Sequence, residues 1–370
     1  MDRINLVRLK EVMNRAAFGK ELTIGFLGGS ITQGSLASEQ KNTYAYRVWT
    51  WWKQTFPKAE FHYVNGGIGG TSSHYGVARA VTDLLMYQPD FVVVDFSVND
   101  EADAFFQETY EGLVRKLVSW DSKPAVVLLH NVFYDTGLSA QEYHQAVGKW
   151  YGLPCISIRD TVYQRIQAGE LKRTELTPDG LHPNDRGHEL VAAEVIRFLE
   201  EVKAWVLDGG EWKEEWECRK EEGLPSALTA NGYEQMRRLT IRECSPRLFG
   251  FAADTEEKMG HLDAFKNGWI GRHGGDRIVF EVEGENIALQ YRKSVKKPAF
   301  CALAVVDGKR EEGVLLDGNF DEDWGDCQYL QVLMHHGERG KHLVEVEVLP
   351  LAEEDAVSFY LMGVIVGGKG

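Results

Sequence analysis

The chain has 370 residues, 44% of them hydrophobic and 26% charged, values that are ordinary for a folded protein and exclude a disordered or fibrous chain. Its 41 Lys and Arg residues against 56 Asp and Glu residues give a net charge of −15, which would repel nucleic acid and anionic membranes. We therefore expect neither as a partner. At roughly 100 to 200 residues per domain, the length suggests two domains.

The N-terminal segment mixes charged and apolar residues and lacks the continuous apolar core of a signal peptide. Residues 1–20 are therefore expected to form an amphipathic helix, and no apolar run is long enough to span a membrane. The five cysteines are odd in number, widely spaced and never in a C-x-x-C pair, which argues against disulfides and a zinc site. They are Cys155, Cys218, Cys244, Cys301 and Cys327. A reducing, cytoplasmic location is expected.

From about residue 22 to 199, short apolar runs alternate with helix-length amphipathic stretches, the pattern of a three-layer α/β domain with a parallel sheet. The predicted strands are Leu22–Leu27, Phe61–Val64, Phe91–Phe96, Ala125–Leu129 and Cys155–Ile158. The predicted helices are Tyr44–Phe56, Ser73–Met86, Phe105–Trp120, Ala140–Trp150 and Asp185–Val202.

The composition shifts after Trp205, where a stretch rich in Gly, Glu, Lys and Trp has no clear period. We predict a first domain over residues 1–205, a linker over 206–225 and a second domain over 226–370. Short alternating strands separated by turns predict an antiparallel β-sandwich there. They are Arg277–Val282, Ile287–Tyr291, Cys301–Val306, Leu330–Met334, His342–Leu349 and Val357–Val366.

In an open α/β sheet, ligands bind at the carboxyl ends of the strands, and four polar segments follow predicted strands or precede the last helix. They are Gly28–Thr32 with Ser30, Asn65–Thr71 with four glycines and loop residue Gly70, Ser97–Asp100 with Asn99, and Thr177–Pro183 with Asp179 and His182. Each alone is common in ordinary turns. Together they supply what acyl transfer needs: a nucleophile, a base, an orienting carboxylate and oxyanion donors.

The sequence contains none of the common motifs that bind nucleotides or catalytic metals. The glycine-rich segment has Ser72 where a dinucleotide-binding loop needs its third glycine, and no P-loop occurs. No H-E-x-x-H pair or comparable histidine spacing favours a metal-dependent hydrolase. We expect no cofactor and no metal.

The four segments resemble the sequence blocks of the SGNH, or GDSL-like, hydrolase superfamily. The resemblance implies a nucleophile at Ser30, oxyanion donors at Ser30, Gly70 and Asn99, a general base at His182 and its partner at Asp179. Two positions depart from the usual blocks: Gly29 stands where Asp is usual, and Ser97 stands where Gly is usual. Both departures put the local hydrogen bonding in question but remove no catalytic group.

More narrowly, the G-G-S-I-T first block and the appended β-sandwich resemble the two-domain carbohydrate esterases of family 17, acetyl-mannan esterases of gut bacteria with a jelly-roll domain like a carbohydrate-binding module. This resemblance implies removal of acetyl groups, chiefly at the 2-position of mannose, from manno-oligosaccharides. Alternatives are an esterase for acetylated xylan or pectin, one for another acyl group, or an inactive scaffold that binds carbohydrate. A homo-oligomer stays open.

Tryptophans offer candidate sugar contacts. Trp269 and Trp324 are expected in loops of the second domain, where they bind sugar or pack between domains or protomers. The cluster Trp49, Trp51 and Trp52 lies in a predicted helix, where core packing is favoured over sugar stacking.

Overall fold

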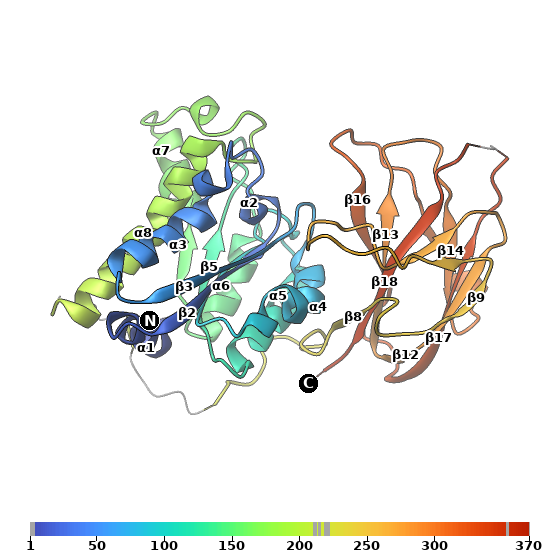
Figure 1. Cartoon of the computed structure of the whole chain (residues 1–370), viewed down its shortest axis with the longest axis horizontal. Coiled ribbons are helices and arrows are strands. Elements are labelled where there is room, and N and C mark those ends of the chain that lie inside the picture. Colours follow the sequence, from blue (N-terminus) through green and yellow to red (C-terminus); the bar gives the residue numbers. More distant parts are fainter. Residues whose placement is uncertain (1–3, 210–212, 214–215, 218–222, 353–354, 370) are drawn as a thin grey trace. The chain divides into compact units, whose positions relative to one another are not determined.

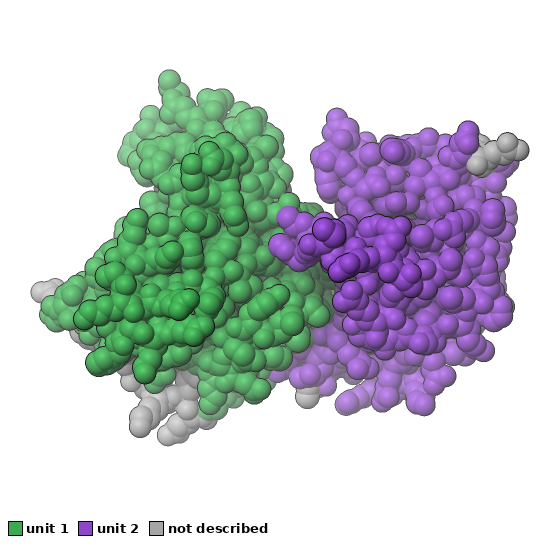
Figure 2. Space-filling model, viewed as in Figure 1, with its two compact units in different colours: residues 1–231 green, residues 232–370 purple. Residues whose placement is uncertain are grey.

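The computed structural model describes residues 4–209, 213, 216–217, 223–352 and 355–369. The chain divides into two compact units, Met1–Asn231 and Gly232–Gly370 (Figure 2). Much of the predicted linker lies outside the described residues. Residues 225–229 are held by the first unit, since Arg115 donates to Pro225 O at 3.0 Å and Trp150 Nε1 to Ser226 O at 2.7 Å.

The first unit is built on a five-stranded parallel sheet with the order β3-β2-β4-β5-β6. Its strands are β2 (Glu21–Gly28), β3 (Glu60–Gly67), β4 (Phe91–Asp95), β5 (Ala125–His130) and β6 (Cys155–Ser157). Every predicted strand is present. Because the strand order reverses between β2 and β4, the carboxyl ends of these two strands define the crevice where open α/β sheets bind ligands.

Helices cover both faces of this sheet (Figure 1). On one face lie α1 (Val7–Ala17), α3 (Tyr44–Thr55) and α8 (Asp185–Leu207), and on the other α4 (Ser73–Asp83), α5 (Ala104–Ser119) and α6 (Gln141–Trp150). The shorter helices are α2 (Ser30–Gln33), α7 (Gln164–Gln167), η1 (Gln40–Asn42), η2 (Leu85–Tyr87), η3 (Arg159–Tyr163) and η4 (Arg173–Glu175). This confirms the three-layer α/β prediction.

The core on the α1/α3/α8 face explains the tryptophan-rich helix. Trp52 is fully buried and stacks on Phe56, and Trp51 is nearly buried in the same cluster. Core packing is therefore confirmed for these two, and Trp49 packs against the cluster while partly exposed. None of the helices in the described part of the chain is long and apolar enough to cross a membrane.

The second unit is an antiparallel β-sandwich, as predicted. One sheet has the order β10-β11-β18-β13-β16, with β8 paired to β18, and the other has the order β15-β14-β17-β12-β9. The strands are β8 (Arg237–Leu239), β9 (Arg247–Phe249), β10 (Ala252–Ala253), β11 (Trp269–Gly271), β12 (Arg277–Gly284), β13 (Asn286–Lys293), β14 (Ala302–Val306), β15 (Val314–Leu316), β16 (Cys327–Met334), β17 (Gly340–Val348) and β18 (Phe359–Gly367). The short helix η5 (Arg310–Glu312) and the strand pair β1 (Ile4–Asn5) and β7 (Trp216–Glu217), which belongs to the first unit, complete the elements.

Candidate active site

Ser30 stands at the carboxyl end of β2, where the strand turns into α2. Its side chain contacts a histidine that lies far along the sequence: His182 Nε2 is 2.9 Å from Ser30 Oγ. The other ring nitrogen of His182 lies 2.6 Å from Asp179 Oδ2. The three residues thus form one hydrogen-bonded series of hydroxyl, imidazole and carboxylate. In this order the carboxylate fixes the tautomer whose Nε2 can accept the serine proton.

The turn that carries Asp179 and His182 is held rigidly just before α8. Asp179 Oδ1 accepts the backbone amides of Leu181 at 2.9 Å and His182 at 2.8 Å. Gly180 has φ of +82°, a conformation that favours glycine, and its carbonyl accepts the amide of Tyr134 at 2.7 Å. This turn therefore fixes the spacing between carboxylate and imidazole.

The surroundings of Asp179 favour its charged form. Partial burial opposes ionisation, but the hydrogen bond from His182 and the backbone amides of Leu181 and His182 outweigh it and lower the pKa of Asp179 to about 2. The carboxylate therefore stays negative until the pH falls to about 2, and it can stabilise an imidazolium that forms during a reaction.

Asn99 follows β4 and reaches the serine turn from the neighbouring strand. Its side chain lies against Gly29, where a Cβ at that glycine would stand only 2.1 Å from Asn99 Oδ1 and 2.9 Å from Nδ2. With Asn99 placed in this way, a side chain at position 29 would collide with it, so the arrangement requires glycine where Asp is usual. The amide side chain of Asn99 thus lies beside the Ser30 turn, as expected for an oxyanion donor.

Asp100, the next residue, anchors the Asn99 turn. Asp100 Oδ1 accepts the amide of Ser73 at 2.8 Å at the start of α4, and Oδ2 contacts His144 Nε2 at 3.0 Å. The hydroxyl of Ser97 donates to Asn131 O at 2.8 Å. A serine at the position of the usual glycine therefore ties this turn to the end of β5.

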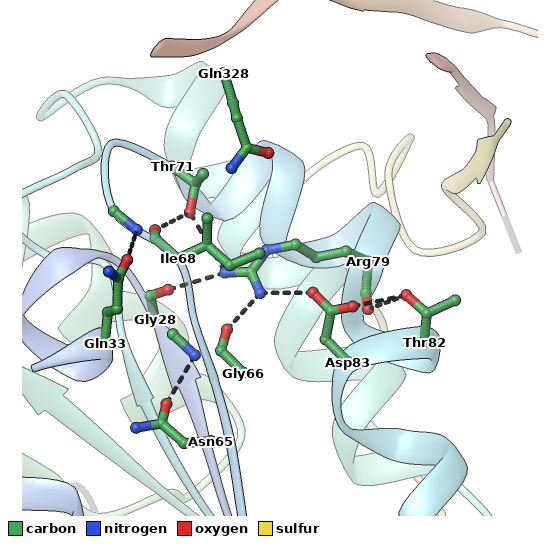
Figure 3. Close-up of polar contacts among 12 residues, drawn as sticks. Gly28, Gln33, Asn65, Gly66, Ile68, Thr71, Arg79, Thr82, Asp83 and Gln328 are labelled. Carbon is green, nitrogen blue, oxygen red and sulfur yellow. Dashed lines mark hydrogen bonds and ion pairs between the residues drawn. The ribbon is translucent and has the colours of Figure 1, made fainter. Parts of the chain in front are cut away.

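The glycine loop after β3 is tied to the serine turn by a buried cation (Figure 3). Arg79, only 1% exposed, donates through Nη2 to Gly28 O at 2.9 Å and through Nη1 to Gly66 O, and Asp83 neutralises it at 2.9 Å. It also contacts Thr71 Oγ1 at 3.4 Å. One guanidinium therefore joins the ends of β2 and β3 and both ends of the loop.

The tip of this loop lies beside the nucleophile. A Cβ placed on Gly69 would lie 3.6 Å from Ser30 Cβ, and the Gly69 amide donates to Gln33 Oε1 at 2.6 Å. Gly70 follows with φ of +67°. The Gly69 amide is thus already engaged, and the next residue, Gly70, is the candidate oxyanion donor that the family resemblance implies.

A buried carboxyl group lies beneath the turn. Asp95, at the end of β4, accepts hydrogen bonds from Asn131 Nδ2 at 2.8 Å and Thr32 Oγ1 at 3.3 Å. Burial outweighs these bonds and raises the pKa of Asp95 to about 7. We did not single out Asp95, Asn131, Arg79 or Gln33 in the sequence. A single acid within the otherwise apolar run Phe91–Phe96 was the available signal for Asp95.

The two candidate sugar-binding tryptophans differ. The expectation for Trp269 is wrong: it lies in β11, is 1% exposed and packs edge-on against Phe280 with ring centroids 5.1 Å apart, so it belongs to the sandwich core. Trp324 is 55% exposed and sits in a loop of the second unit, where its ring meets Phe320 at 5.0 Å and its indole donates to Glu322.

Among the described residues of the first unit, no group of three His, Cys, Asp or Glu side chains lies close enough together to hold a metal ion. The four described cysteines, Cys155, Cys244, Cys301 and Cys327, are free thiols.

A serine, a histidine and an aspartate in hydrogen-bonded series at the switch point of a parallel sheet define the site of a serine-type hydrolase. Residues 26–190 match the GDSL-like Lipase/Acylhydrolase family. Two crystal structures of a two-domain esterase active on acetylated mannans, one of them co-crystallized with mannopentaose, are 48% identical to this chain with a TM-score of 0.94. The matches cover 100% of this chain and 96% and 97% of those chains. A comparison with curated protein sequences gives no match.

The chain belongs to the GDSL-like lipase and acylhydrolase family, and it is a carboxylic ester hydrolase. The resemblance to GDSL-like hydrolases and the predicted fold, an α/β domain followed by a β-sandwich, are thereby confirmed.

Proposed function

We propose that this esterase removes O-acetyl groups, at the 2-position of mannose, from acetylated manno-oligosaccharides through an acetyl-enzyme on Ser30. The observation that carries the mechanism is the series Ser30–His182–Asp179, with contacts of 2.9 and 2.6 Å. The substrate class is supported by the 48% identity over the full chain to an esterase active on acetylated mannans.

The first half-reaction acylates the serine. Ser30 Oγ attacks the acetyl carbonyl carbon while His182 Nε2 takes its proton, which gives a tetrahedral oxyanion. The backbone amides of Ser30 and Gly70 and the side-chain amide of Asn99 donate hydrogen bonds to that oxyanion. The bond to the sugar oxygen then breaks, and His182 gives its proton to the departing hydroxyl.

The second half-reaction restores the enzyme. His182 takes a proton from water as the water oxygen attacks the acetyl carbon of the acyl-enzyme. The second tetrahedral oxyanion collapses, Ser30 Oγ leaves and receives the proton from His182, and acetate is released. Asp179 stays ionised through both halves because its low pKa opposes proton transfer from the imidazolium.

Sugar binding is proposed to involve Trp324 of the second unit. Its exposed indole offers the flat apolar face that sugar rings stack on, and a large aromatic side chain in a loop is otherwise costly to leave in water. The substrate is proposed to be an oligosaccharide in the cytoplasm, a setting that the four free thiols support.

The test is acetate release from acetylated manno-oligosaccharides, with acetylated xylo-oligosaccharides alongside, by the wild type and Ser30→Ala. We expect release from the mannan substrate to fall about 10³-fold or more in the variant, while Ser35→Ala, a control in the same segment, stays near the wild type. Release from xylan alone would overturn the mannan assignment. No release from any acetyl ester would favour the alternative of a carbohydrate-binding protein on an inactive scaffold. Product mapping by NMR tests the 2-position.

A further inference from the structure

We propose that Gln33 is a positioning residue for the oxyanion hole, acting through the Gly69 amide on the neighbouring donor, Gly70. The inference rests on the proposed function, because it takes Gly70 as an oxyanion donor. Gln33 is the last residue of α2, which begins at Ser30, so one short helix carries both the nucleophile and the side chain that holds the loop.

The contact is made where the loop passes closest to the nucleophile. Gln33 Oε1 accepts the Gly69 amide at 2.6 Å, and a Cβ on Gly69 would lie 3.2 Å from that oxygen and 3.6 Å from Ser30 Cβ. Gly69 therefore lies directly between Gln33 and Ser30, with little room for a side chain on the Gln33 side.

The stem of the loop is held by other groups. Asn65 donates to Thr32 O at 2.8 Å and accepts the Gly67 amide at 2.8 Å, and the Ile68 amide donates to Gly28 O at 3.1 Å. These bonds tie the loop to α2 and β2 as far as residue 68.

The tip consists of Gly69 and Gly70, two residues with the widest backbone freedom of all. The peptide plane between them carries the Gly70 amide, so its orientation depends on how Gly69 is held. Gln33 holds the preceding peptide plane, between Ile68 and Gly69, through its hydrogen bond with the Gly69 amide. Removing the Gln33 oxygen frees the tip to adopt backbone conformations in which the Gly70 amide points away from the oxyanion.

The expected effect follows from when the oxyanion exists. The donor acts on charge that develops in the transition state, so misplacing it lowers kcat rather than substrate affinity. Deleting one oxyanion donor outright typically costs 10²- to 10³-fold in kcat, and loosening one without deleting it should cost less, about 10-fold.

The experiment compares Gln33→Met with Gln54→Met, which replaces an exposed glutamine of α3. The measurements are kcat and KM for a small acetyl ester, and the inhibition constant of a small alkylboronic acid that forms a tetrahedral adduct with Ser30. We expect Gln33→Met to lower kcat about 10-fold, leave KM within about twofold and weaken the boronic acid about 10-fold. Because Gln33 is exposed, the thermal unfolding midpoint of the Gln33→Met variant should match that of the Gln54→Met control.

Unchanged kcat and boronic acid affinity in Gln33→Met would overturn the inference, and so would a rise in KM at constant kcat, which would indicate contact with substrate instead. The variant Ser30→Ala distinguishes a failure of the Gln33 inference from a failure of the proposed function. If Ser30→Ala retains full activity, the serine mechanism fails. If activity depends on Ser30 but Gln33→Met behaves as the wild type, only the inference fails.

Discussion

His182 Nε2 lies 2.9 Å from Ser30 Oγ, although the two residues are 152 positions apart in the chain. The sheet makes this contact possible, because β2 delivers Ser30 to the carboxyl edge and the turn before α8 returns to the same edge. The contact needs a particular imidazole tautomer, and Asp179 selects it from the other side of the ring at 2.6 Å.

Asp179→Asn should therefore impair catalysis while preserving the fold. An asparagine oxygen can still accept the amides of Leu181 and His182, but its NH₂ group would face His182 Nδ1 and favour the wrong tautomer. We expect kcat to fall on the order of 10³-fold. Steady-state kinetics with a small acetyl ester measures this, and a loss below about fivefold would contradict the orienting role.

The pH profile should separate the carboxylate from the imidazole. The folded-state pKa of Asp179 is about 2, below its ordinary value of 3.8, so its charge is lost only as the pH falls through about 2. Activity should nevertheless decline at mildly acidic pH, because His182 must be neutral to accept a proton. A kcat/KM that is flat from about pH 5 to 8 would contradict His182 as the base.

Asp95 should make the protein less stable as the pH rises. Its folded-state pKa of about 7 lies above the ordinary 3.8, so the folded state keeps a proton that the unfolded state has lost between these values. The free energy of unfolding should fall across this window, by up to about 4 kcal/mol from this group. Urea unfolding at pH 5 and pH 7.5 measures the fall, which Asp95→Asn should reduce. An equal fall in wild type and variant would exclude Asp95 as its source.

Glu111 should control how firmly residues 228–229 are held to the first unit. This fully buried carboxylate of α5 accepts the amides of Leu228 at 2.6 Å and Thr229 at 2.7 Å, and also the hydroxyls of Thr229 and Tyr151. Glu111→Ala leaves these partly buried donors without their acceptor, which removes several hydrogen bonds to a charged group at once.

We expect protease to cut residues 223–231 faster in Glu111→Ala than in the wild type. Glu11→Ala, at an exposed position of α1, is the matched control. Equal cleavage rates in all three proteins would show that Glu111 does not hold this segment.

The two tryptophans of the second unit should respond in opposite ways. Trp269→Ala should lower the free energy of unfolding by about 3 to 5 kcal/mol, because it leaves a cavity in the sandwich core. Trp324→Ala should leave stability nearly unchanged but raise KM for acetylated manno-oligosaccharides and not for a small acetyl ester. A Trp324→Ala variant with unaltered KM for both substrates would remove it from the sugar-binding site.

Two features of the sequence made the fold and part of the site predictable. One is the periodicity of apolar residues, and the other is the rule that parallel sheets bind ligands at the carboxyl ends of their strands. Ser30, Asn99 and His182 were identifiable because parallel sheets gather their strand ends at one edge. Gln33 and Arg79 had no such signal, since each is a single polar residue whose backbone partners are defined only by the fold. Asp95 stands at a strand end, but its partners Asn131 and Thr32 are brought to it only by the fold.

Local context misled the sequence reading of Trp269. Asn267 and Gly268 precede it and are typical of a turn, yet the strand they introduce is only three residues long and lies in the core. For the same reason β8 to β10, of two or three residues each, were not predicted, because such short strands show no alternation.

The most direct test of the central claim is to trap the acetyl-enzyme. Wild-type protein is mixed with acetylated manno-oligosaccharides, quenched in acid within milliseconds and digested, and its peptides are weighed. Our account predicts one added acetyl group on the peptide that carries Ser30, absent from Ser30→Ala. Acetate release at the wild-type rate by Ser30→Ala, or an acetyl group found on a different residue, would contradict it.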